Sequence, residues 1–157
     1  MFRQLQNPIE NERGERLLGV YEGDVGVEHV SVSIVLAQHP QGVVLVRNSR
    51  RSIWELPGGY IDRAERASDC ALRELYEESG LKGSGIVLLG ILEIERPARP
   101  GGLFQCAVYQ CDAEGVPSAD GAEVSAVAYW QPRTKISPIS AIDEALLRGG
   151  VLAPTAL

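Results

Sequence analysis

The sequence predicts a single domain of the α/β class, with α+β as the alternative, in which helices pack on a mixed β-sheet, and three observations support this prediction. Stretches typical of strands alternate along the chain with stretches typical of helices, as in a sheet covered by helices. The 157 residues, 45% of them hydrophobic, are enough to bury one core. No internal repeat, low-complexity tract or long linker divides residues 1–157, so we expect one domain.

The N-terminal segment, residues 1–28, is the least regular part of the chain. It mixes charged, polar and apolar residues, and only residues 14–21 have the composition of a short strand. Residues 30–37 and 43–47 are rich in Val, Ile and Leu, and the turn sequence His39-Pro40-Gln41-Gly42 lies between them. This arrangement predicts a hairpin of two core strands.

A helix is predicted over residues 66–79, because this stretch contains neither Gly nor Pro and places four apolar residues at helical spacing. Gly80 follows it in the position that ends many helices. The rest of the chain predicts three strands, at residues 86–94, 103–111 and 124–130, and a closing helix at residues 140–148.

The charge balance excludes several classes of protein. Fifteen Lys and Arg against 21 Asp and Glu give a formal charge of -6, and such a surface repels a nucleic-acid polymer. The longest apolar stretches, such as residues 86–92, fall well short of the ~20 residues that span a membrane. Residues 1–16 also lack the apolar block of a signal peptide, so we expect a cytoplasmic protein without membrane contact.

The few cysteines and histidines leave carboxylates as the main metal-binding side chains. The three cysteines form no CxxC pair, and neither histidine occurs in a metal-ligand spacing. A disulfide framework and a zinc site are therefore not expected. Carboxylate oxygens favour a hard divalent cation, Mg²⁺ or Mn²⁺.

The predicted central helix carries a cluster of acidic residues. Glu74, Glu77 and Glu78 lie at positions i, i+3 and i+4, so their carboxylates crowd one face of the helix. Like charges at this spacing destabilise a helix unless something compensates them. One interpretation is a solvated acidic face in which Arg73 pairs with Glu77, and the other is a cation site.

The residues around this cluster decide between the two interpretations. Read along the chain, the run is Gly59, five residues, Glu65, seven residues, Arg73-Glu74-Leu75, one residue, Glu77-Glu78, one residue, Gly80-Leu81. This run resembles the Nudix box at every fixed position. Chance would produce it on the order of once in 10^8 windows, which excludes coincidence.

The pattern also has a direct physical rationale. A Pro-Gly-Gly turn at residues 57–59 allows close backbone approach and frees a carbonyl, and the helix presents three carboxylates towards the same point. Arg73 can hold the acidic face through its several donors. A pyrophosphate would be repelled by these carboxylates unless a metal ion reversed the local charge, so the substrate also implies the metal.

The resemblance implies a three-layer α/β/α sandwich around a mixed sheet and hydrolysis of a nucleoside diphosphate linked to another group. It further implies that the Gly58 carbonyl, Glu77 and Glu78 bind Mg²⁺ or Mn²⁺ and that Glu74 binds or orients the metal and could serve as a base. In the same way, Arg73 is expected to position Glu77, and Glu65 is similar to a residue that orients the helix.

Two positions depart from the usual pattern. Ala64 stands where a Gly often precedes the box Glu, and Arg66 stands where Ser or Thr often starts the helix. Both departures concern the entry to the helix.

A further base is expected from a loop, because related enzymes often carry a Glu just before a strand that ends in Trp. Glu123, which precedes the strand ending at Trp130, is similar to that residue and is our candidate. An exposed loop carboxylate without a role is the alternative. The rival candidates are Glu93, Glu95 and Glu114.

Features outside the box suggest a substrate. Pro97 lies sixteen residues after Leu81 and resembles the proline that marks many ADP-ribose pyrophosphatases, while Arg51 and Arg96 are candidates for pairing with phosphates. The first expectation is a small-molecule substrate, ADP-ribose, cleaved to AMP and ribose 5-phosphate. The alternatives are a nucleoside triphosphate pyrophosphatase that removes damaged nucleotides and a non-catalytic module that senses a nucleotide sugar. Whether the chain forms a homodimer is left open.

Overall fold

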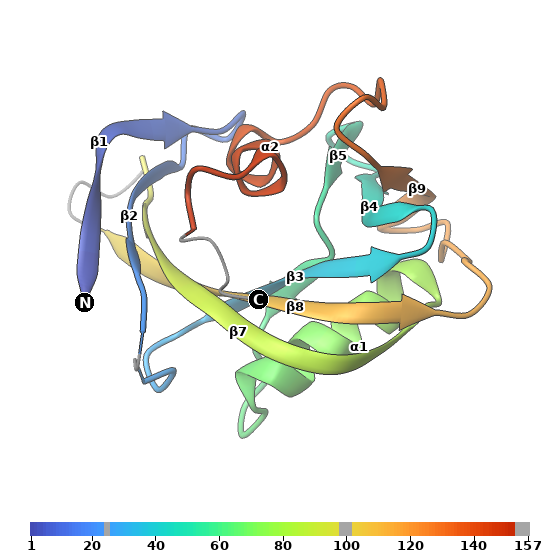
Figure 1. Cartoon of the computed structure of the whole chain (residues 1–157), viewed down its shortest axis with the longest axis horizontal. Coiled ribbons are helices and arrows are strands. Elements are labelled where there is room, and N and C mark those ends of the chain that lie inside the picture. Colours follow the sequence, from blue (N-terminus) through green and yellow to red (C-terminus); the bar gives the residue numbers. More distant parts are fainter. Residues whose placement is uncertain (24–25, 98–101, 153–157) are drawn as a thin grey trace.

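The computed structural model describes residues 1–23, 26–97 and 102–152, and within them a nine-stranded mixed sheet forms the centre of the molecule (Figure 1). The strand order is β1-β2-β7-β8-β3-β4-β5, while β6 pairs with β3 and β9 pairs with β4. Strands β3 and β8 run parallel, and the other paired strands run antiparallel. The mixed sheet with its helices confirms the predicted α/β class.

The elements follow one another in chain order. The strands are β1 (Phe2–Glu10), β2 (Arg16–Tyr21), β3 (Val32–His39), β4 (Gly42–Asn48), β5 (Ile53–Glu55), β6 (Gly58–Tyr60), β7 (Lys82–Glu95), β8 (Leu103–Glu114) and β9 (Val124–Trp130). The helices are α1 (Ala67–Ser79) and α2 (Ala141–Arg148).

Two hydrophobic cores lie on opposite faces of the sheet, because successive side chains of a strand point to opposite sides. Val35 and Ala37 pack in the core beneath α1, whereas Leu36 between them packs in the core with Ile142 and Leu146 of α2. In Figure 1, α1 lies behind β7 and β8. The arrangement is therefore helix, sheet, helix, as the resemblance implied.

The predicted hairpin of β3 and β4 is correct only next to its turn. The two strands pair at Gln38 with Val43 and at His39 with Gly42, and then separate. Beyond that point β6 takes the place of β4 beside β3, at Val32 to Ile34. This separation brings Gly58 and Gly59 into the middle of the sheet, directly in front of α1.

Strand β1 is a finding that the sequence did not predict. It forms one edge of the sheet and pairs with β2 to make a hairpin. Its turn, residues 11–15, is organised by the buried Asn11, whose Oδ1 accepts hydrogen bonds from the amides of Arg13 and Glu15, each at 3.0 Å. The segment with the least regular sequence is thus a defined part of the fold.

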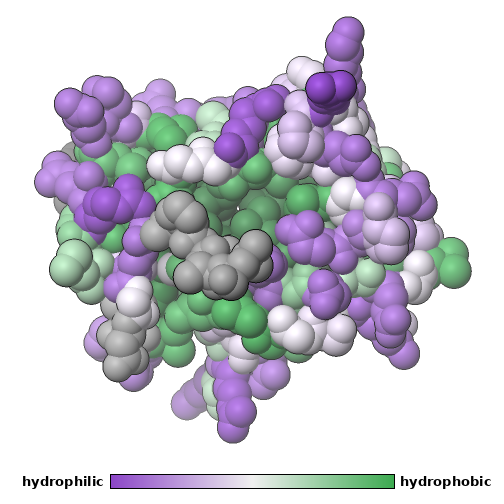
Figure 2. All heavy atoms as spheres, in the orientation of Figure 1, coloured by the Kyte–Doolittle hydropathy of each residue, from purple (hydrophilic) through white to green (hydrophobic). Residues whose placement is uncertain are grey.

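The face of the molecule seen in Figure 2 has hydrophobic residues gathered around its middle and hydrophilic residues around its edge. None of the helices within the described residues combines the length and apolar character that crossing a membrane requires.

Candidate active site

The entry to α1 contains both of the departures that the sequence showed. Ala64 has φ +64°, in the left-handed region that a residue with a Cβ rarely adopts, which explains why glycine is common there. Arg66 is the N-cap residue and makes no side-chain capping bond. At the other end, Gly80 adopts φ +76° and its amide donates to the Tyr76 carbonyl, which closes the helix as predicted.

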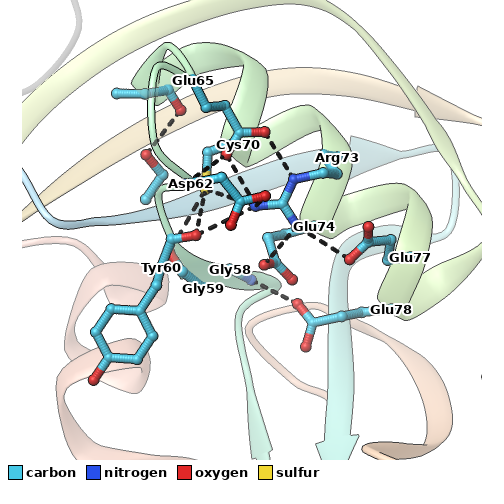
Figure 3. A network of polar contacts seen from close by, with 12 residues as sticks. Gly58, Gly59, Tyr60, Asp62, Glu65, Cys70, Arg73, Glu74, Glu77 and Glu78 are labelled. Carbon is cyan, nitrogen blue, oxygen red and sulfur yellow. Dashed lines mark hydrogen bonds and ion pairs between the residues drawn. The ribbon is translucent and has the colours of Figure 1, made fainter.

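Arg73 lies at the centre of a network of carboxylates (Figure 3). Its Nε and Nη2 donate to the two oxygens of Glu65 at 2.7 and 3.0 Å, a bidentate pair. Its Nη1 donates to Glu74 and to Glu77, each at 3.1 Å. The guanidinium therefore holds three carboxylates of the box in fixed positions.

The network shifts the pKa values of its members in opposite directions. The hydrogen bonds from Arg73, together with the Asp62 amide, lower the pKa of Glu65 to about 2. Burial raises the pKa of Glu74 despite its contact with Arg73. Burial also raises the pKa of Glu78 to about 8, and the neighbouring Glu74 adds to the effect. Burial thus disfavours the charged form of two carboxylates in the site, Glu74 and Glu78, and the nearby positive charge does not offset this effect.

The predicted turn proves to be a bend at Pro57 followed directly by strand β6, and this bend with Gly58 and Gly59, called the Gly-Gly turn below, forms the opposite wall of the site. The Gly58 amide donates to the Glu78 carboxylate at 2.8 Å. A Cβ on Gly59 would overlap the carboxylate of Glu74, so only glycine lets this side chain approach the turn. The structure therefore places Gly58, Glu74 and Glu78 side by side, with Glu77 joined to them through Arg73.

These residues have the chemistry that a hard divalent cation requires. All the candidate donors are carboxylate or carbonyl oxygens, and Glu74 and Glu78 are carboxylates whose charge is poorly compensated. No group of three His, Cys, Asp or Glu side chains in the described part of the chain already has a metal-binding arrangement. Coordination would therefore require side-chain movements that bring these carboxylates closer together.

Glu123 lies at the edge of this cluster. It is exposed, it directly precedes β9, and its charge contributes to the raised pKa values of both Glu74 and Glu78. Two of its rivals have other partners, because Glu93 accepts a hydrogen bond from the Tyr21 hydroxyl at 2.7 Å and Glu95 pairs with Arg16 at 3.4 Å. Glu114 lies opposite Lys82 at the far end of β8.

A cleft opens beside the Gly-Gly turn on the α2 side of the sheet. Its apolar walls include Val32, Ile34, Leu56, Leu92, Ile94 and Phe104. Its polar lining includes Asn11, Arg13, Glu15, Arg51, Glu55 and Asp143. Gly58 and Gly59 line this cleft and also contact the carboxylate cluster, whereas Glu74, Glu77 and Glu78 are not among the lining residues.

The three predicted substrate-binding residues have different positions. Arg51 lines the cleft and pairs with Glu55 at 2.9 Å. Arg96 and Pro97 are not among the lining residues. The Arg96 guanidinium lies 4.3 Å from the ring centre of Phe104, a residue of the cleft wall, and Pro97 packs against Gly14 in the β1–β2 turn. Residues 98–101, which follow in the sequence, lie outside the described residues.

Sequence reasoning missed three acidic residues of the cleft, Glu15, Glu55 and Asp143. Glu15 belongs to the least regular segment of the sequence. Glu55 precedes the Leu-Pro-Gly-Gly run and reads only as part of the approach to the box. Asp143 resembles any acidic residue in the first turn of a helix, so its sequence context contains no signal. In the structure its Oδ2 accepts the Leu56 amide at 3.0 Å, and burial raises its pKa to about 7.

The fold and the site define the class to which the chain belongs: an α/β/α domain with a glutamate-rich helix packed behind a Gly-Gly turn. The model of the NUDIX domain family matches residues 27–148, so the chain belongs to this family. Members of the family generally use divalent metal ions.

Curated relatives share short stretches with the chain. A Bacillus subtilis protein named "Putative 8-oxo-dGTP diphosphatase" is 26% identical over 99 residues, which is 63% of this chain and 64% of that protein. An RNA pyrophosphohydrolase of Ruthia magnifica is 39% identical over 59 residues, 38% of this chain and 33% of that protein. The chain thus spans less than two thirds of the length of these relatives.

Solved structures share the fold over most of the chain. The Bacillus subtilis pyrophosphohydrolase BsRppH, solved as a mutant, matches with a TM-score of 0.70 and 18% identity, over 91% of this chain and 92% of that one. The NUDIX domain of Shewanella oneidensis NrtR, solved in complex with ADP ribose, matches with a TM-score of 0.61 and 22% identity, over 82% and 90%. At these identities the likeness shows the fold alone.

Proposed function

We propose that this chain is a metal-dependent pyrophosphohydrolase that cleaves the pyrophosphate bond of a nucleoside diphosphate derivative. ADP-ribose, cleaved to AMP and ribose 5-phosphate, is the first substrate to test. The observation that carries the proposal is the position of Glu74 and Glu78 against Gly58 and Gly59, two residues that also line a cleft with apolar walls. Such a cleft suits a nucleoside, while the carboxylate cluster suits a cation and a phosphate.

The residues have distinct roles in this proposal. The Gly58 carbonyl and the carboxylates of Glu74, Glu77 and Glu78 hold the cation, and Arg73 with Glu65 keeps the acidic face in position. A bound Mg²⁺ or Mn²⁺ would polarise the phosphoryl oxygens and neutralise the charge of the leaving group. In this proposal each residue of the box either binds the metal or positions a residue that does.

The reaction itself is a displacement at phosphorus. The oxygen of a water molecule forms a bond to one phosphorus, and the bond from that phosphorus to the bridging oxygen breaks. The leaving group departs as a phosphate, and Glu123 accepts a proton from the attacking water. Its exposed position at the rim allows this carboxylate to reach the water and to release the proton to solvent.

The polar lining of the cleft helps to choose among the substrates of the relatives. Glu15, Glu55 and Asp143 place acidic groups there, while Arg13 and Arg51 are paired with Glu15 and Glu55 at 3.0 and 2.9 Å. This balance disfavours a ligand that fills the cleft with phosphates. It favours a base or sugar that offers hydrogen-bond donors.

Pro97 supports ADP-ribose as the first substrate, and the ADP-ribose complex of the NrtR domain is consistent with that choice. The relative described as an 8-oxo-dGTP diphosphatase favours a second candidate, the hydrolysis of a nucleoside triphosphate. The two candidates differ in the products that they yield, because the second releases inorganic pyrophosphate.

The deciding experiment is a product assay with ADP-ribose, 8-oxo-dGTP, dGTP and 5′-triphosphorylated RNA, each with Mg²⁺, with Mn²⁺ and with EDTA. Metal-dependent formation of AMP from ADP-ribose supports the proposal. Turnover of nucleoside triphosphates alone, with pyrophosphate as a product, replaces it with the second candidate. Tight binding of ADP-ribose without turnover of any substrate would contradict both and identify a sensing module.

A further inference from the structure

The segment that leads into the Gly-Gly turn is held by α2 and the residues just before it through three hydrogen bonds. The Trp54 amide donates to the Pro138 carbonyl at 2.9 Å, and the Ser140 amide donates to the Trp54 carbonyl at 2.9 Å. The third bond joins the Leu56 amide to the Asp143 carboxylate at 3.0 Å. Asp143 is therefore the side chain that extends this clamp to within two residues of Gly58.

The same segment is held from its other side by β3 and α1. The Val35 amide donates to the Pro57 carbonyl at 3.0 Å, and Glu78 accepts the Gly58 amide at 2.8 Å. Leu56 and Pro57 are buried, and proline has a fixed φ, so little freedom remains between the two sets of contacts. The position of the Gly58 amide thus depends on α2 as well as on α1.

Burying a carboxylate at position 143 costs free energy. Asp143 lies beside Ile142, a core residue, and its surroundings contain the like-charged Glu55 and Glu12, with Arg13 as the nearby cation. A hydrophobic residue of similar size would avoid the cost of burying the charge, but it could not accept the Leu56 amide. The hydrogen bond is therefore the feature that the carboxylate supplies.

We propose that Asp143 is a positioning residue for the metal site: by accepting the Leu56 amide it fixes the turn that carries Gly58, and through the Gly58 amide it orients the carboxylate of Glu78. The inference rests on the proposed function, because it assigns Glu78 and Gly58 to the metal. It links α2, on the cleft side of the sheet, to a ligand on α1, on the opposite side.

The test compares two substitutions that differ only in the acceptor. Asp143→Leu removes the acceptor, and Asp143→Asn keeps an acceptor oxygen while removing the charge. Glu144→Gln is the matched control, since Glu144 follows Asp143 on α2 but pairs with Arg148 at 3.6 Å, at the end of the helix. The readouts are the affinity for Mn²⁺ by isothermal titration calorimetry and the exchange rate of the Gly58 amide by NMR.

We expect Asp143→Leu to weaken Mn²⁺ binding by about tenfold, the usual effect of removing an outer partner of a metal ligand. The same variant should speed exchange of the Gly58 amide, whereas Asp143→Asn and Glu144→Gln should stay within about twofold of the parent in both readouts. Should Asp143→Leu fail to fold, Asp143→Ala removes the same acceptor with a smaller side chain.

Unchanged Mn²⁺ affinity and unchanged Gly58 exchange in a folded acceptor-less variant would overturn the inference, even if its unfolding temperature were lower. Equal losses in Asp143→Leu and Asp143→Asn would also overturn it, because charge rather than the hydrogen bond would then be responsible. Absence of Mn²⁺ binding by the parent chain is a different result, since it refutes the proposed function; the Gly58 exchange rates then decide the link between α2 and the turn.

Discussion

Glu78 is the most unusual side chain of the site, because it is a half-buried carboxylate whose protein hydrogen-bond partner is one backbone amide. Burial and the nearby Glu74, Glu55 and Glu123 raise its pKa to about 8. An ionised group in such a place destabilises the folded chain unless a cation compensates it. The Glu78 carboxylate is therefore suited to bind a cation.

Glu78→Gln should abolish catalysis while preserving the fold. Loss of a metal ligand should lower kcat by about 10³-fold, because the cation supplies several kcal/mol of charge stabilisation. The metal-free variant should unfold at a higher temperature than the parent at pH 8, since an uncompensated charge has been removed. Steady-state kinetics and calorimetry measure the two effects, with Glu114→Gln, at the far end of β8, as the control. Full activity in Glu78→Gln would remove Glu78 from the metal site.

Glu123→Gln tests the proposed base. We expect kcat to fall by about 10²-fold with little change in KM, because a general base acts in the transition state and contributes little to ground-state binding. Glu95→Gln, at a rival residue paired with Arg16, should leave kcat unchanged. If the two variants behaved in the opposite way, the base would belong to β7 rather than to the loop before β9.

The elements differ in how well the sequence predicts them. Helix α1 is predicted closely, because its apolar spacing and Gly80 are local signals. Strand β1 is not, because it is an edge strand exposed along most of its length and lacks a hydrophobic alternation. The separation of β3 and β4 depends on the insertion of β6, a tertiary contact that no local pattern records.

The same distinction applies to the site. The box residues can be placed from their spacing alone, since one helix and one turn position them. Asp143 and Glu55 cannot, because the parallel bridge between Trp54 and Ile139 brings their segments together from distant parts of the chain. Arg73 is identified by its spacing, but its bidentate pairing with Glu65 requires the path of the loop before α1 to be known.

The entry to α1 is a strained element that one substitution should improve. Ala64 has φ +64° on an exposed loop, so Ala64→Gly should stabilise the chain by about 1 kcal/mol. For a chain of this length that corresponds to a rise of about 2–4 °C in the unfolding temperature. Ala145→Gly, in the interior of α2, is the control and should destabilise the chain by a similar amount. Equal destabilisation by both changes would show that Ala64 is not strained in solution.

At the scale of the whole molecule, the shifted carboxyl groups predict how stability depends on pH in the absence of metal. Glu65 has a pKa lowered from 4.5 to about 2, so its stabilising effect is present above pH 4.5 and is lost as the pH falls towards 2. Glu78 has a pKa raised from 4.5 to about 8 and Asp143 a pKa raised from 3.8 to about 7, so the folded chain holds their protons more tightly. Their stabilising effect is complete below these ordinary values and is lost as the pH rises from there to about 7 and about 8.

Stability of the metal-free chain should therefore be greatest near pH 4.5, the value from which Glu65 and Glu78 shift in opposite directions. Thermal unfolding between about pH 3 and pH 9 in the presence of EDTA measures it, and added Mg²⁺ should flatten the fall above about pH 6. A metal-free chain that became steadily more stable from about pH 5 to pH 8 would contradict the burial of both carboxylates.

The turn between β1 and β2 has a consequence for how this protein can change over time. Asn11, Arg13 and Glu15 line the cleft, yet they lie outside residues 27–148, which carry the family's features and all of the box residues. Mutations in the codons for Arg13 and Glu15 are therefore expected to alter ligand preference without changing the residues proposed to bind the metal. Selection for a new substrate, in nature or in a directed-evolution library, has a starting point at Arg13 and Glu15, because Asn11 and Gly14 are needed for the turn itself.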